Sequence, residues 1–224
     1  MLWTDYNVRT RMNWSLRALV ALPFLVAACS PPKETPAESV SPKSPAGAAP
    51  AAATQGVVAG RVPTGGPGQS SVVVLQPKAP VEVAQVLPPV MDQVALTFIP
   101  GVLVVRTGHP VDFRNSDDTL HNVRVNEDST KAGTFNVAIP MGGDYRFTFE
   151  KEGFYNVGCD IHPAMSATIY ASTSPYATLS NTAGQFEIRD VPPGAYNAVV
   201  FAGTQRIERP VEVSPARTEL DFTP

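Results

Sequence analysis

The sequence has few cysteines, few histidines and no excess of basic residues. Its 224 residues include only two cysteines and three histidines, although 43% are hydrophobic, which is enough to bury a core. The 23 prolines and 16 glycines interrupt any helical periodicity, so no helix is predicted and short strands are favoured. A formal net charge of −3 leaves no basic excess, which argues against nucleic-acid binding.

The N-terminal segment has the pattern of an export signal. Three arginines precede an apolar run over residues 18–28. This run is too short for a bilayer core, which needs about 20 residues, but it suits the hydrophobic part of a signal peptide. Translation can start at Met1 or at Met12, because the residues after Met12 already include a positive charge.

The apolar run ends in "VAAC", residues 26–29, which resembles the bacterial lipobox. The resemblance implies that residues 1–28 are removed and that Cys29 carries a lipid, which anchors the protein on the periplasmic side of the envelope. Ser30 implies the outer rather than the inner membrane. Ordinary cleavage beside an incidental cysteine is the alternative. Residues 29–55 are rich in proline, alanine and serine, which predicts a tether and not a fold.

With Cys29 lipidated, Cys159 has no partner for an internal disulfide, the usual use of cysteine in exported proteins. His162 and Met165 follow it in "CDIHPAM". Thiolate and thioether are soft donors and imidazole is borderline, a combination that favours copper. Zinc rarely takes methionine, and C-x-x-C-H haem attachment needs a second cysteine. His121, 38 residues before Cys159, completes a blue-copper ligand set.

The alternative to a copper site is a buried thiol beside a core methionine and two surface histidines. The remaining histidine, His109, lies in a predicted turn, "RTGHPV", and is not expected to be a ligand. Met91 and Met141 are expected in the core or on the surface.

Short strand patterns recur from residue 56 onward and predict an all-β protein. They cover residues 57–62, 70–77, 102–115 as two strands, 120–126, 145–159, 166–172, 185–191, 195–202, 208–215 and 218–224.

Residues 90–171 resemble a cupredoxin of the plastocyanin–amicyanin family, through "VLVVRTGHPVDFRN", "LHNV" and "GFYNVGCDIHPAMSATIY". The C-x2-H-x2-M spacing is that of amicyanin. The resemblance implies a Greek-key β-sandwich over residues 88–172. It also implies copper ligands at His121, Cys159, His162 and Met165.

Two neighbours of these ligands matter in the resemblance. Asn122 matches an asparagine that ties the two ligand loops together by hydrogen bonds, a contact that orients the ligands. Ala164 stands where related bacterial proteins often have a bulky aromatic residue. This position therefore does not decide whether a hydrophobic patch lies beside His162.

Residues 173–224 resemble a smaller β-sandwich, the carboxypeptidase regulatory-like (transthyretin-like) module. Its G-x-F-x-I-x-x-V-P-P-G-x-Y motif runs over residues 184–196, and the zinc motif of the peptidase itself is absent. Residues 56–87 resemble the first strands of the same module, which would make the cupredoxin an insertion. Alternatively, these strands belong to the cupredoxin part.

The resemblances imply a membrane-tethered blue copper protein that exchanges single electrons with a redox partner protein and is not an enzyme. His162 is the expected edge for this exchange. Two other classes stay open: an extracytoplasmic copper-binding or delivery protein, and a non-metal cell-envelope adhesion module. A delivery protein often has methionine- or histidine-rich tracts, which this sequence lacks.

Overall fold

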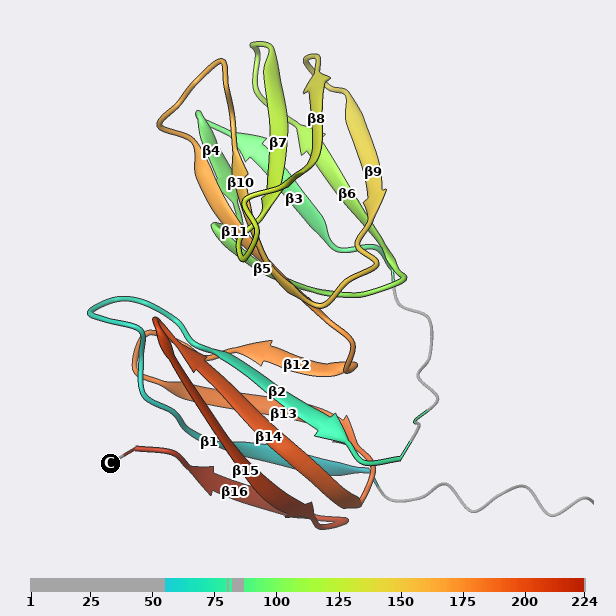
Figure 1. The fold of residues 1–224 in the computed structure, drawn as a ribbon, viewed down its shortest axis with the longest axis vertical. Coiled ribbons are helices and arrows are strands. Elements are labelled where there is room, and N and C mark those ends of the chain that lie inside the picture. The colour runs from blue at the N-terminus through green and yellow to red at the C-terminus, as the bar shows by residue number, and fades with distance from the viewer. Residues whose placement is uncertain (1–54, 80, 82–86, 224) are drawn as a thin grey trace, which may run out of the picture. The chain divides into compact units, whose positions relative to one another are not determined.

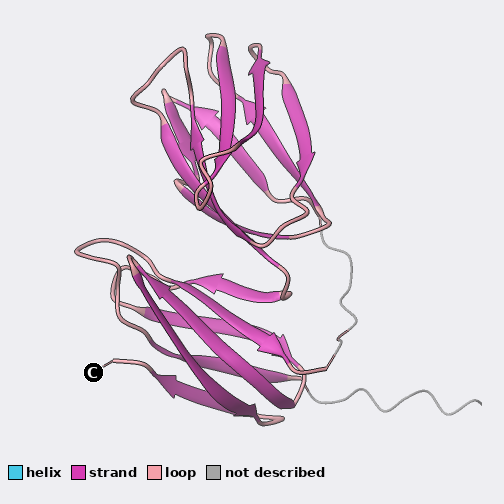
Figure 2. Cartoon of the chain, viewed as in Figure 1, coloured by secondary structure: helices cyan, strands magenta, loops and turns pink. Residues whose placement is uncertain are grey.

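The computed structural model describes residues 55–79, 81 and 87–223, and its regular structure there consists of strands (Figures 1 and 2). This confirms the all-β prediction. The predicted signal peptide over 1–28, the lipid on Cys29 and the tether up to residue 54 lie outside the described residues. Within the described part, no helix is long and apolar enough to cross a membrane.

Nine strands in the middle of the chain form a sandwich of two sheets, with strand orders β5-β11-β10-β7-β8 and β4-β3-β6-β9. The strands are β3 (Val90–Val94), β4 (Thr97–Ile99), β5 (Val102–Arg106), β6 (Pro110–Asn115), β7 (His121–Glu127), β8 (Gly133–Ile139), β9 (Asp144–Thr148), β10 (Gly153–Gly158) and β11 (Ser166–Ser172).

Alternating side chains of these strands fill the space between the two sheets. In β7, Val123 and Val125 are fully buried, while Arg124 between them faces outward, because successive residues of a strand point to opposite faces. Phe113 and Ile169 enter the same core from β6 and β11. Each such buried apolar side chain contributes about 1.5–3 kcal/mol to stability.

The remaining strands form a second sandwich, with strand orders β13-β1-β16 and β12-β2-β14-β15. They are β1 (Gly56–Arg61), β2 (Val72–Pro77), β12 (Tyr176–Leu179), β13 (Gln185–Val191), β14 (Gly194–Ala202), β15 (Gln205–Val213) and β16 (Arg217–Asp221). β1 and β2 precede β3–β11 in sequence, yet they pair with strands that follow them. The sandwich of β3–β11 is thus inserted between β2 and β12.

The motif over residues 184–196 shapes this second sandwich. Gly184 has a φ of 78°, and a Cβ there would lie 2.2 Å from the carbonyl oxygen of Val62, so only glycine fits. The Tyr196 hydroxyl donates to the Pro192 carbonyl at 2.8 Å and closes the turn between β13 and β14. Membership of the transthyretin-like module remains a prediction.

A small cluster of buried side chains includes residues from both sandwiches. Tyr170 of β11 packs with Val72, Val74 and Val199. The rings of Phe154 and Tyr170 lie 4.7 Å apart. Apolar groups on the outer face of the sheet that contains β10 and β11 are therefore covered by β2 and β14.

Candidate metal centre

Strand pairing brings together ligands that are far apart in sequence. His121 is the first residue of β7, and Cys159 directly follows the last residue of β10. These two strands are antiparallel neighbours, so the start of β7 lies beside the end of β10. His162 and Met165 lie in the loop from β10 to β11. The centre is therefore at the end of the sandwich where β8 and β10 end and β7 begins (Figure 1).

Three of the predicted ligands present their donor atoms to one point. Cys159 Sγ lies 3.9 Å from His121 Nδ1 and 4.0 Å from His162 Nδ1, and the two Nδ1 atoms are 2.9 Å apart. Donors held about 2.0–2.3 Å from one metal ion lie roughly 3–4 Å from each other. Within the described residues, this is the one group of three or more His, Cys, Asp or Glu side chains placed to hold a metal.

Met165 closes the ligand loop. Its N–H donates to the His162 carbonyl at 3.0 Å, and its carbonyl accepts from the Cys159 N–H at 3.4 Å. The His162 N–H in turn donates to Cys159 Sγ at 3.4 Å. Met165 is buried in the same core cluster as Cys159. The predicted fourth ligand is thus fixed in position by the backbone of the other two loop ligands.

Asp117 orients His121, and sequence reasoning did not identify it. Asp117 Oδ2 lies 2.8 Å from His121 Nε2, and the imidazole is completely buried. A carboxylate there accepts the Nε2 proton, which leaves the Nδ1 lone pair directed toward Cys159 and His162. The pKa of Asp117 lies below its ordinary value because its carboxylate accepts from the Leu96 N–H and, further, from His121 and the Ala95 N–H.

The same carboxylate holds the turn between β3 and β4. It accepts from the Ala95 N–H at 2.5 Å and from the Leu96 N–H at 2.9 Å. Ala95 and Leu96 have φ angles of 51° and 57°, which non-glycine residues rarely adopt. Asn-Gly is the usual sequence for such a turn. Asp117 therefore stabilises an unfavourable turn and a ligand at once.

Asn122 joins the two ligand loops, in the arrangement that the resemblance implies. Its Oδ1 accepts from the Asp160 N–H at 2.7 Å and from the Ile161 N–H at 3.3 Å, and it lies 3.2 Å from Cys159 Sγ. Since Asn122 follows His121 directly, a shift of either loop would break these contacts.

Comparison with known proteins agrees with this geometry. The family model for copper binding proteins of the plastocyanin/azurin family matches residues 85–171. A plastocyanin from Rumex obtusifolius is 31% identical over 80 residues, which are 32% of this chain and 81% of the relative. The chain belongs to the plastocyanin/azurin family. Copper is accordingly the cofactor of this cupredoxin, and the His-Cys-His-Met donor set fits it.

Two solved structures similar to the cupredoxin part have TM-scores of 0.36. One is a mutant amicyanin in its Cu(I) form, 23% identical, where the match covers 45% of this chain and 98% of that chain. The other is the copper-containing nitrite reductase from Thermus scotoductus SA-01, 27% identical, with 43% of this chain and 25% of that chain covered.

His109 is not part of the donor cluster, and Met91 and Met141 lie outside the loop that contains Cys159, His162 and Met165. His109 lies in the turn before β6, with its Nδ1 3.0 Å from the Thr107 carbonyl, at the opposite end of that strand from Asn115. Met91 is fully buried in the core, and Met141 is exposed.

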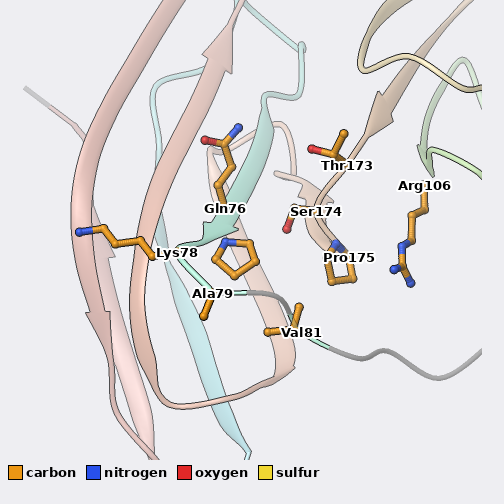
Figure 3. Close-up of a pocket in the computed structure, with 9 residues that line it drawn as sticks. Gln76, Lys78, Ala79, Val81, Arg106, Thr173, Ser174 and Pro175 are labelled. Atoms are coloured by element: carbon orange, nitrogen blue, oxygen red, sulfur yellow. The ribbon is translucent and has the colours of Figure 1, made fainter.

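A pocket of about 510 Å³ contains no residue of the metal centre. Figure 3 shows its lining, with Gln76 from β2, Arg106 from the end of β5, and Ser174. The amino group of Lys78 and the guanidinium of Arg106 lie on opposite sides of the opening and do not converge on one point.

Proposed function

We propose that this cupredoxin carries single electrons by cycling between Cu(I) and Cu(II). The observation that carries the proposal is the convergence of donor atoms of His121, Cys159 and His162 within 4.8 Å. Cys159 would supply a thiolate and His121 and His162 would supply imidazole nitrogens to the copper. Met165 would add a thioether that tunes the potential.

The hydrogen bonds around the ligands support a carrier role. An electron carrier reacts fastest when its ligands hold one geometry in both oxidation states. Asp117 fixes the ring of His121, and Asn122 fixes the loop that contains Cys159. These contacts preorganise the ligands, since each partner is itself held by further hydrogen bonds.

Exposure points to His162 as the edge through which electrons pass. His121, Cys159 and Met165 are buried, whereas His162 is partly exposed. Exposed apolar side chains flank the centre: Leu96, Leu120, Met141 and Ile161, each between 45% and 63% exposed.

Chain adjacency and backbone hydrogen bonds place these four residues near the site. Leu120 and Ile161 directly precede His121 and His162. Leu96 is joined to Asp117, and the turn that contains Met141 is joined to Asn115 through the Gly142 N–H. This apolar surface provides a docking area for a redox partner even though Ala164 is small.

Copper delivery is the competing role, and burial argues against it. Delivery requires ligands that an acceptor protein can reach, and three of the four ligands here are 2% exposed or less. An electron carrier has no such requirement, because electrons pass through the edge of a ligand.

We further propose that a lipid on Cys29 anchors the protein at the periplasmic face of the bacterial envelope. The support is the "VAAC" sequence followed by a proline-rich tether. Cys29→Ser should release the protein in soluble form. Retention of this variant in the membrane fraction after a carbonate wash would contradict the anchor.

Copper loading followed by voltammetry tests the carrier role. We expect one copper per chain and reversible oxidation and reduction without loss of metal. His121→Ala should weaken copper retention, and His109→Ala, the matched control, should not change it. Release of copper on each reduction would assign the protein to the delivery class.

A further inference from the structure

Asp160, the residue after Cys159, is held by three side chains of the neighbouring strands β7 and β8. Its Oδ1 forms an ion pair with Arg124, 3.0 Å from Nε. Its Oδ2 accepts from Asn136 Nδ2 at 2.8 Å and from Asn122 Nδ2 at 3.2 Å. Arg124 lies on β7 and Asn136 on β8, so the start of the ligand loop is tied to both strands.

Arg124 also lies against the residue before Cys159. Gly158 is its partner in the pairing of β10 with β7. A Cβ at Gly158 would lie 3.0 Å from Arg124 Nη2, closer than most real contacts. Glycine at this position therefore gives the guanidinium room to cross the strand and reach Asp160. The ion pair spans the segment that contains Cys159.

The two charges of this pair act in opposite directions on a redox metal beside Cys159. A nearby cation stabilises the reduced, less positive form, and a nearby anion stabilises the oxidised form. Arg124 and Asp160 are each 47% exposed, so water and salt weaken both effects. As long as the pair is intact, the two contributions largely cancel.

We propose that Arg124 and Asp160 are positioning residues of the copper centre, which clamp the start of the ligand loop and balance each other's charge beside Cys159. This inference rests on the proposed function. The balance of charge should be visible in the reduction potential of the copper protein. The clamping of the loop should be visible in the exchange of its amide hydrogens.

The first measurement is the reduction potential at low ionic strength. Arg124→Gln should lower the potential, and Asp160→Asn should raise it. The double variant should return close to the wild-type value, because both charges are gone. Arg146→Gln is the matched control: it removes the same charge from the Arg146–Asp112 pair on β9 and β6, and should shift the potential less. Shifts of the same sign, or a control shift as large, would overturn the charge claim.

The second measurement is hydrogen exchange of the metal-free protein. The Asp160 and Ile161 amides donate to Asn122 Oδ1, so they should be protected in the wild type. Exchange should accelerate in Arg124→Gln and also in the double variant, but not in Arg146→Gln. Unchanged exchange would overturn the positioning claim.

The two readouts separate this inference from the proposed function. A wild-type protein that binds no copper would refute the proposed function, while the amide exchange would still decide the positioning claim. A copper-loaded, reversible wild type whose variants show no opposed shifts would leave electron transfer standing and refute the charge claim.

Discussion

Asp117 Oδ2 lies 2.8 Å from His121 Nε2, and the same carboxylate caps the turn at Ala95 and Leu96. One side chain thus supports both a metal ligand and a backbone conformation that costs about 1–2 kcal/mol per residue. The stability of the β3–β4 turn and the orientation of His121 therefore depend on one residue.

Asp117→Ala should lower both stability and copper affinity. The loss of stability should be about 1–3 kcal/mol, because donors that the carboxylate satisfied are left without a partner. Leu96→Gly, combined with it, should restore part of the stability, since glycine adopts a positive φ without strain. It should not restore copper affinity. Denaturant unfolding and a copper competition assay measure the two effects, and joint recovery would mean that Asp117 acts only on the turn.

Met165→Leu should leave the colour of the copper protein in place and raise its reduction potential. Leucine keeps most of the volume at this buried position but removes the thioether that would favour Cu(II) as a ligand. Absorption spectroscopy and voltammetry on the same sample check both parts. An unchanged potential would show that Met165 is not a ligand.

Tyr170 stabilises the folded protein, and this contribution should be lost in alkaline solution. Burial, a hydrogen bond to Glu152 and the charge of Glu152 hold the pKa of Tyr170 well above its ordinary value near 10. The neutral form is favoured in the folded protein, so this stabilisation is complete below about pH 10 and is lost as the pH rises further. Tyr170→Phe should be less stable at pH 7 but should lose less stability between pH 10 and 11. Parallel losses in both proteins would contradict this.

Truncated chains should reveal the inserted arrangement of the cupredoxin. Residues 56–172 should express poorly, because β1 and β2 lose the strands with which they pair. Residues 88–172 contain a complete sandwich core and should fold and bind copper. This fragment exposes Tyr170 and Phe154, so its solubility should be lower than that of the full chain. Equal behaviour of the two fragments would indicate independent tandem domains.

Strands with regular alternation could be predicted from the sequence, and those with mixed faces could not. β7 and β13 alternate clearly and were predicted. β3 was missed because Gln93, a polar residue, is fully buried and donates to the Asn122 carbonyl, which breaks the apolar pattern. The edge strand β8 was missed because most of its residues are at least partly exposed. Residues 145–159, predicted by one alternating pattern, form two strands, β9 and β10.

The ligands could be predicted because chemistry restricts which residues bind copper, whereas their supporting residues carry no such restriction. Cys159, His162 and Met165 are recognisable by type and spacing. Asp117, Arg124 and Asp160 are ordinary polar residues in sequence, and their roles arise from the loops and strands that the fold places together. Only the short distance from Asp117 to His121 along the chain gives any hint.

The visible absorption spectrum of the copper-loaded protein tests the central claim most directly. A Cys159 thiolate bound to Cu(II) together with His121 and His162 should give an intense blue or blue-green colour, and Cys159→Ser should remove it, because a hydroxyl is a hard and poorly ionised donor. A colourless wild-type protein after loading with Cu(II), or a Cys159→Ser protein with the same colour as the wild type, would contradict the assignment.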